Sequence, residues 1–250
     1  MELEKAAAPP KVLVFFDIDG TLLLTDGAGR VAIRAALETV YGTSGHLDAY
    51  VFHGKTDPQI VVELMCGAGL DESEVRRRMA EVWPVYLEVL ERELEVRRAA
   101  DRITLLPGVV VLLQALVEKE GVSLGLLTGN IEEGARLKLA AAGVASDFVV
   151  GAYGSDSEDR AEVARVAQER SRVDGTAAPA MIVVGDTPED VACARAVNAA
   201  AVAVATGRHS VSELEETGAD AVFEDFSDTK EVVARILSLS GMTVGRGEGR

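Results

Sequence analysis

Apolar residues along the 250-residue chain gather in blocks of two kinds. Short continuous runs, such as 12–16, 122–127 and 181–184, have the length of strands that are buried on both faces of a parallel sheet. Between these runs, apolar positions recur with the three- to four-residue spacing of amphipathic helices. This repeated order predicts an α/β fold with a doubly wound, Rossmann-like parallel sheet.

A long helical stretch interrupts the alternation after the first strand. Its expected helices lie at about 30–40, 57–67 and 71–98, the last with Pro84 as a kink or as a junction between two helices. We therefore expect a core domain at 1–24 and 104–240, a helical cap domain at 25–103 and a disordered tail at 241–250. From Pro107 on, the expected helices are 107–120, 132–142, 158–173, 190–197, 212–216 and 229–237, and the expected strands are 122–127, 148–150, 181–184, 201–205 and 221–223.

Charge and composition narrow the classes of ligand. The chain carries 41 Asp and Glu against 25 Lys and Arg, which disfavours binding to nucleic acid and to anionic membranes. A small phosphorylated ligand remains possible if the site neutralises it locally with a cation or with basic side chains. With 3 histidines and no pair at ligand spacing, zinc is disfavoured, whereas paired aspartates suit Mg²⁺.

The amino terminus and the cysteines bear on the compartment. The segment Met1-Glu-Leu-Glu-Lys5 lacks the basic region and the apolar core of a secretory signal, and no apolar run approaches the roughly 20 residues of a membrane-spanning helix. Cys66 and Cys193 lie far apart within helical patterns, as expected of buried free thiols. We expect a cytoplasmic protein.

The first strand ends in the most informative polar residues of the chain. Asp17 and Asp19 follow the apolar run one residue apart, so their side chains can share a face, while Gly20 lets the backbone turn away. The carboxyl ends of parallel strands are where such sheets place their ligand sites. An Asp-Gly hairpin turn is the alternative, but a Gly-rich loop and a helix follow where a hairpin needs a returning strand.

Two further strands end in polar clusters. The strand at 122–127 leads into Thr128-Gly129-Asn130, where the threonine could bind a phosphate oxygen or simply cap a helix. The strand at 181–184 leads into Gly185-Asp186-Thr187-Pro188-Glu189-Asp190. Capping explains Asp190 or Thr187 well but leaves Asp186 unexplained, and four convergent aspartates would repel one another without a cation.

These segments resemble the haloacid dehalogenase-like hydrolase superfamily. The resemblance rests on Asp17-Ile-Asp19-Gly20-Thr21, on the strand-end Thr128 and on the segment from Gly185 to Asp190, in that order along the chain. The helical insertion directly after the first motif is similar to the phosphoglycolate phosphatase and β-phosphoglucomutase branch. The resemblance covers nearly the whole chain.

The resemblance implies a phosphatase with Mg²⁺ as cofactor. Asp17 would attack phosphorus and form an aspartyl-phosphate intermediate, and Asp19 would act as acid and then as base. Asp17, the backbone carbonyl of Asp19 and Asp186 would hold the metal, with Asp190 in support through water or a neighbouring group. Thr128 would hold a phosphoryl oxygen.

One departure from the family pattern concerns its basic residue, usually a lysine before the strand of Asp186. No lysine occurs between Lys138 and Lys230, and Arg160 is the best substitute, although it could equally be a surface residue paired with Asp156 or Asp159. In the cap, Lys55 could meet an anionic substrate or be a surface residue. Gly129 and Asn130 are further candidate substrate contacts.

Several alternatives stay open at this point. A β-phosphoglucomutase shares every core motif and differs by transferring the phosphoryl group to a sugar. A phosphate-binding protein on a retired enzyme fold is an alternative of another class, although Asp17, Asp19 and Asp186 are all present. The identity of the phosphomonoester and the oligomeric state do not follow from the sequence.

Overall fold

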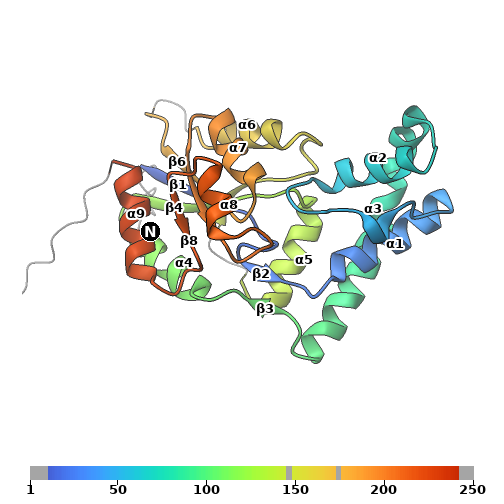
Figure 1. Ribbon diagram of the computed structural model, residues 1–250, viewed down its shortest axis with the longest axis horizontal. Coiled ribbons are helices and arrows are strands. Elements are labelled where there is room, and N and C mark those ends of the chain that lie inside the picture. The colour runs from blue at the N-terminus through green and yellow to red at the C-terminus, as the bar shows by residue number, and fades with distance from the viewer. Residues whose placement is uncertain (1–10, 145–147, 173–175, 242–250) are drawn as a thin grey trace, which may run out of the picture.

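A parallel sheet forms the centre of the protein. The computed structural model describes residues 11–144, 148–172 and 176–241, so all of the predicted tail at 241–250 except its first residue lies outside the described residues. Within these ranges, a six-stranded sheet has the order β5-β4-β1-β6-β7-β8, with every neighbouring pair parallel (Figure 1). The predicted doubly wound α/β fold is confirmed. The strands are β1 (Val12–Phe16), β4 (Val122–Leu127), β5 (Phe148–Ala152), β6 (Ala180–Gly185), β7 (Ala200–Val204) and β8 (Ala221–Phe223).

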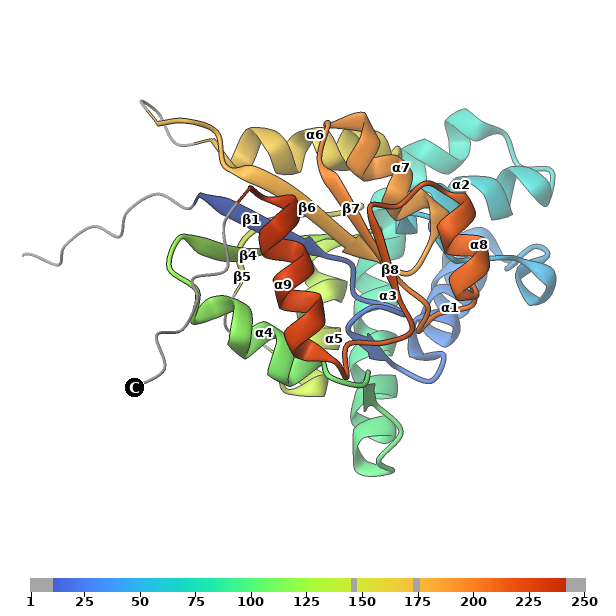
Figure 2. The same cartoon turned by 60° about the vertical axis from the view of Figure 1, so that its left-hand side comes forward.

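Helices cover both faces of this sheet (Figure 2). One face packs against α4 (Val109–Val117), α5 (Glu132–Ala142) and α9 (Thr229–Leu239), and the other against α6 (Arg160–Arg170), α7 (Pro188–Ala196) and α8 (Val211–Glu216). Alternate residues of β1 enter the two cores, Val14 and Phe16 on one side and Leu13 and Phe15 on the other. This double burial explains why β1 is a continuous apolar run.

The helical insertion packs around a core of its own. It consists of α1 (Ala28–Tyr41), the 3₁₀ turn η1 (Leu47–Ala49), α2 (Asp57–Gly67) and α3 (Glu72–Ala99). Large buried side chains such as Leu37, Leu64, Tyr86 and Leu90 meet there. Pro84 lies inside α3, which is one continuous 28-residue helix, so the predicted junction between two helices is wrong.

The insertion leaves and rejoins the core through a short antiparallel pair. Strand β2 (Leu23–Leu24) pairs with β3 (Thr104–Leu105), and the Leu106 amide donates to the Leu22 carbonyl at 3.0 Å. Sequence analysis did not predict this pair, because two-residue strands are too short to show an alternation.

Direct contacts hold the insertion against the core. The Asp57 amide donates to the Gly129 carbonyl at 2.7 Å, and the Ile131 amide donates to Asp57 Oδ2 at 2.8 Å. Arg76 of α3 donates to both carboxylate oxygens of Glu158, at 2.7 and 2.8 Å, and this ion pair also joins the insertion to the core. Helix α5 lies between the sheet and the insertion and contributes Ala135 to the core of the sheet.

The cysteines and the lengths of the helices bear on the remaining predictions from the sequence. Cys193 is buried and Cys66 is half-buried, and both are free thiols. Each helix in the part of the chain that the structure describes is too short or too polar to cross a membrane.

Candidate active site

The carboxyl ends of three neighbouring strands meet below the insertion. Asp17 follows β1, Thr128 follows β4 and Asp186 follows β6. A cleft of about 440 Å³ opens between this edge and the helical insertion. Both parts of the chain line the cleft, among them Asp17, Asp19, Lys55, Thr128, Asn130 and Arg160.

Three buried carboxylates stand close enough to share a cation. Asp17, Asp186 and Asp190 each offer an oxygen atom, and these atoms all lie within 4.8 Å of one another. Burial raises the pKa of Asp17 to about 7, although Arg160 opposes the change. Burial and then the charges of Asp190 and Asp17 raise the pKa of Asp186 to about 8. A cation would offset this repulsion and restore the charged forms.

The surroundings of Asp186 fit a metal ion. Its Oδ1 accepts from Thr21 Oγ1 at 3.0 Å, whereas its buried Oδ2 has no hydrogen-bond partner among the described residues. A Cβ on Gly207 would lie 1.8 Å from this Oδ2 atom, and one on Gly20 would lie 2.4 Å from it, so glycine at both positions leaves room for this carboxylate. Carboxylate oxygens without a protein donor are the ligands that Mg²⁺ prefers.

Protein donors occupy the carboxylate of Asp190. Its Oδ2 accepts from the Thr187 amide at 3.0 Å and from Thr187 Oγ1 at 2.6 Å, which forms a capping box at the start of α7. Its Oδ1 accepts from the Arg160 guanidinium. Asp190 therefore anchors the helix start and the arginine at the same time.

Arg160 lies inside the site rather than on the surface. It is 8% exposed at the start of α6, and its Nη2 lies 3.9 Å from Asp17 Oδ2. Burial acts to lower the pKa of Arg160, but the charges of Asp190 and Asp17 outweigh it and raise this pKa further. Asp156, which sequence analysis considered as a surface partner, pairs with Arg170 instead.

The Thr128-Gly129-Asn130 segment links the strand end to the second aspartate. Thr128 is fully buried, and its Oγ1 accepts from Asn130 Nδ2 at 2.9 Å. The same Nδ2 donates to Asp19 Oδ2 at 2.8 Å. A Cβ on Gly129 would lie 2.1 Å from the carbonyl oxygen of Lys55, so a glycine lets the insertion approach here.

Lys138 is a site residue that the sequence analysis missed. Its Nζ donates to Asp19 Oδ2 and to Asn130 Oδ1, each at 2.6 Å, and only 5% of the residue is exposed. A signal was available, since Lys138 follows the buried Ala135 by three residues and precedes the buried Leu139 on α5. A lysine at that spacing lies on the buried face of the helix.

Lys55 lines the cleft, but its ammonium group is engaged. The Nζ atom forms an ion pair with Glu63 and lies 4.9 Å from the centre of the Tyr50 ring. Its backbone carbonyl, rather than its side chain, is what lies against Gly129.

The chain matches a known protein family over most of its length. The family model of the haloacid dehalogenase-like hydrolases matches residues 14–195. The chain therefore belongs to the haloacid dehalogenase-like hydrolase family, an enzyme family, as its motifs predicted. The match includes the helical insertion as well as the residues at the ends of β1, β4 and β6.

Individual relatives are phosphatases by name. A "Phosphoglycolate phosphatase" of Rhodospirillum rubrum is 34% identical over 242 residues, which cover 87% of this chain and 88% of that protein. A "Probable phosphatase IndB" of Dickeya dadantii is 26% identical over 94% of this chain and 98% of its own length. A crystal structure of a hydrolase from Pseudomonas syringae shares the fold, with a TM-score of 0.62 and 22% identity over 90% of this chain and 99% of that one.

Proposed function

We propose that this protein is a Mg²⁺-dependent phosphatase that hydrolyses a small phosphomonoester through an aspartyl-phosphate intermediate. The observation that carries the proposal is that Asp17 and Arg160 line one cleft side by side, while the buried, unpaired Asp186 carboxylate lies directly behind them within 4.8 Å of Asp17. Such a set offers a nucleophile, a metal ligand and a positive charge for the phosphoryl oxygens. The phosphatase names of two relatives support the same reaction class.

The reaction needs two displacements at phosphorus. In the first, an oxygen of Asp17 attacks phosphorus while the bond to the leaving oxygen breaks, and Asp19 gives that oxygen a proton. In the second, water attacks the phosphorus of the aspartyl phosphate, Asp19 takes a proton from the water, and phosphate leaves with Asp17 regenerated. Thr128 and Arg160 bind phosphoryl oxygens during both steps.

The metal would be held by Asp17, by the backbone carbonyl of Asp19 and by Asp186. When bound, Mg²⁺ supplies positive charge that offsets the negative charges of the phosphate and the nucleophile. Asp190 supports this group indirectly, because its own oxygens are taken up by Thr187 and by Arg160.

The cleft favours a small anionic substrate. Several basic side chains line it, among them Arg30, Lys55 and Arg208, although the chain as a whole carries a formal charge of −16. Basic groups lining a cleft attract anions against the field of the rest of the protein. We propose a phosphoglycolate-like ester or a sugar phosphate, with Gly129, Asn130 and Lys55 close to its leaving group.

Phosphate release from an aryl phosphate and from a panel of small phosphomonoesters tests the proposal. We expect turnover with Mg²⁺ that a chelator abolishes and that Asp17→Asn reduces by at least ~10³-fold, the scale of losing a covalent nucleophile. Asp48→Asn is a matched control, because this carboxylate is 87% exposed and lies outside the residues that line the cleft. An absence of release from every ester would contradict the phosphatase proposal.

A second assay, which follows the conversion of a hexose 1-phosphate into the 6-phosphate, separates the β-phosphoglucomutase alternative. A mutase would convert a hexose 1-phosphate into the 6-phosphate without releasing inorganic phosphate, and Asp17→Asn would abolish the conversion. A non-catalytic phosphate-binding protein would show neither reaction.

A further inference from the structure

A buried lysine contacts the aspartate to which we assign proton transfer. Lys138 comes from α5, and its ammonium lies within 2.6 Å of Asp19 Oδ2. Burying a cation is costly unless it is paired, and here Asp19 is the charged partner while Asn130 accepts a second hydrogen bond. Lys138 thus pairs with Asp19, the proposed proton donor, and not with the three clustered carboxylates of Asp17, Asp186 and Asp190.

Asn130 completes a closed set of hydrogen bonds around Asp19. Because an ammonium group can only donate, Lys138 requires the oxygen of the Asn130 amide to face it. The Nδ2 of that amide then faces the other way and donates to Asp19 Oδ2 at 2.8 Å and to Thr128 Oγ1 at 2.9 Å. The lysine therefore fixes Asp19 twice, directly and through the orientation of Asn130.

The helical insertion encloses this set. A Cβ on Gly29 of α1 would lie 3.6 Å from Lys138 Nζ and 3.8 Å from Tyr86 Oη of α3, so α1 packs against the ammonium and Tyr86 lies close by. Burial raises the pKa of Asp57 to about 6, and the Lys138 charge opposes that rise. Lys138 consequently lies where the core helix α5 meets the cap helices α1 and α3.

We propose that Lys138 is a positioning residue that holds the carboxyl group of Asp19 toward the leaving oxygen of the substrate. The inference rests on the proposed function, in which Asp19 protonates that oxygen as its bond to phosphorus breaks. Lys138 makes no contact with phosphorus in this scheme. It restricts the rotation of Asp19, and a proton donor is effective only when it is held within hydrogen-bond reach.

Whether the departing oxygen needs a proton from Asp19 depends on the leaving group. Substrates with different leaving groups can therefore reveal a residue that acts through Asp19. A nitrophenolate leaves readily without protonation, whereas an alkoxide does not. The ratio kcat/KM reports the steps up to departure of the leaving group, because the later hydrolysis of the aspartyl phosphate does not enter it. A residue that acts through Asp19 should therefore matter for alkyl phosphates and much less for nitrophenyl phosphate.

The test measures kcat/KM of the wild-type enzyme and of its variants with two substrates. One is nitrophenyl phosphate, and the other is an alkyl phosphate that the wild-type enzyme hydrolyses. In Lys138→Met we expect the alkyl value to fall by ~10²-fold, within the range of general acid catalysis, and the nitrophenyl value by less than ~5-fold. Asp19→Asn should show the same selectivity with a larger loss. Lys138→Gln keeps a hydrogen-bond donor and should fall between wild type and Lys138→Met, and it serves as the second variant if Lys138→Met does not fold.

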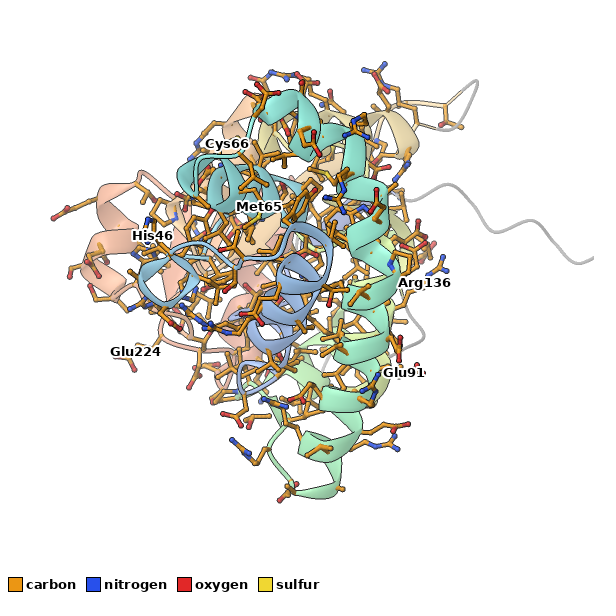
Figure 3. All side chains as sticks on the ribbon, turned by 90° about the vertical axis from the view of Figure 1, so that its right-hand side faces the viewer. His46, Met65, Cys66, Glu91, Arg136 and Glu224 are labelled. Carbon is orange, nitrogen blue, oxygen red and sulfur yellow. The ribbon has the colours of Figure 1, made fainter. Side chains whose placement is uncertain are left out.

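Arg136→Met is the matched control, since it removes a cation from the same helix. Its side chain is 71% exposed, pairs with Glu132 and lies at the outer surface in Figure 3. It should leave both kcat/KM values unchanged. An equal loss for both esters in the Lys138 variants, or a rise in KM alone, would overturn the positioning role while leaving the phosphatase proposal intact. If the wild-type enzyme releases no phosphate from either ester, the proposed function fails and this inference fails with it.

Discussion

Arg160 Nη2 hydrogen-bonds Asp190 and lies 3.9 Å from Asp17 Oδ2. Asp190 is in turn fixed by Thr187 at the start of α7, so one capping interaction sets the position of the cation beside the nucleophile. An arginine in this arrangement can reach a phosphoryl oxygen without losing its anchor, because its guanidinium group carries five donors in a fixed plane.

Arg160→Met should impair both stability and turnover. Removing the cation leaves Asp190 and Asp17 buried without their partner, which costs about 3 kcal/mol and lowers Tm by roughly 6–12 °C. We expect kcat/KM to fall at least ~10²-fold, as for the loss of one group that stabilises developing charge. Arg160→Lys keeps the charge but loses the fork, so both effects should be intermediate.

Thermal unfolding and phosphate release measure these two effects. Arg165→Met is a suitable control, because Arg165 lies on the same helix, is 48% exposed and pairs only with Glu162 among the described residues. It should change the free energy of unfolding by less than about 1 kcal/mol. If Arg160→Met unfolds at the same Tm as the wild type, the Arg160–Asp190 ion pair does not stabilise the fold.

Asp186→Asn should stabilise the metal-free protein at high pH. The pKa of Asp186 is about 8 in the folded protein, above its ordinary value of 3.8, so folding favours its protonated form. The stability that this proton contributes is fully present below the ordinary value and is lost as the pH rises through about 8. Replacing the carboxylate removes that loss.

Melting curves in chelator over a range of pH measure the effect. The Tm of Asp186→Asn should exceed that of the wild type at pH 9, and the difference should shrink toward pH 5. Added Mg²⁺ should raise the Tm of the wild type more than that of the variant. Asp48→Asn replaces an exposed carboxylate and should show no such pH dependence. A lower Tm of Asp186→Asn than of the wild type at pH 9 would contradict the predicted cost of ionising Asp186.

Binding of Mg²⁺ should release protons near neutral pH. In the metal-free protein the pKa values of Asp17 and Asp186 are raised to about 7 and about 8, and a carboxylate must be deprotonated to bind a metal. We expect the affinity to rise between pH 6 and pH 9. Calorimetric titration at pH 7 in two buffers of different ionisation enthalpy counts the protons released, and an affinity independent of pH would contradict the prediction.

Gly129→Ala should push the insertion away from the core. Its Cβ would lie 2.1 Å from the Lys55 carbonyl oxygen, a distance that forces the 53–57 loop to move. Because this loop covers the cleft, we expect kcat/KM to fall by ~10²-fold, the cost of a displacement of about 1 Å. Gly67→Ala is the matched control, since nothing lies within 4 Å of its Cβ, and it should leave turnover unchanged. Equal activity of the two variants would show that the loop contact is dispensable.

The sheet and its strand-end residues could be predicted because both depend on local patterns. The apolar run of β1 reflects burial on two faces, and Asp17 stands out because a charge ends that run. The same reasoning located Thr128 and Asp186. Arg160 was found only through the resemblance to a family, because nothing in the local pattern distinguishes it from a surface arginine.

The features that escaped prediction depend on contacts between distant segments. Lys138 is 119 residues from Asp19, and Arg76 is 82 residues from Glu158. Pro84 was expected to mark a kink or a junction between two helices; α3 is continuous through it and packs against α1, α2 and α5, and this packing outweighs the local cost of the proline. The spacing along α5 places Lys138 on the buried face of its helix, but nothing in the local sequence identifies the distant partner of a tertiary contact.

The β2–β3 pair brings together the two chain connections between the insertion and the core. Its two connections lie side by side as neighbouring strands, so the chain departs from the core and returns to it within about 5 Å. Every strand of the six-stranded sheet lies outside the inserted segment, and so do Asp17, Asp19, Thr128 and Asp186. We therefore expect that the inserted helices can be exchanged as one segment if the contacts of Asp57 and Arg76 with the core are kept, and that such an exchange alters which molecules reach the carboxylates while the path of the main chain through the sheet stays the same.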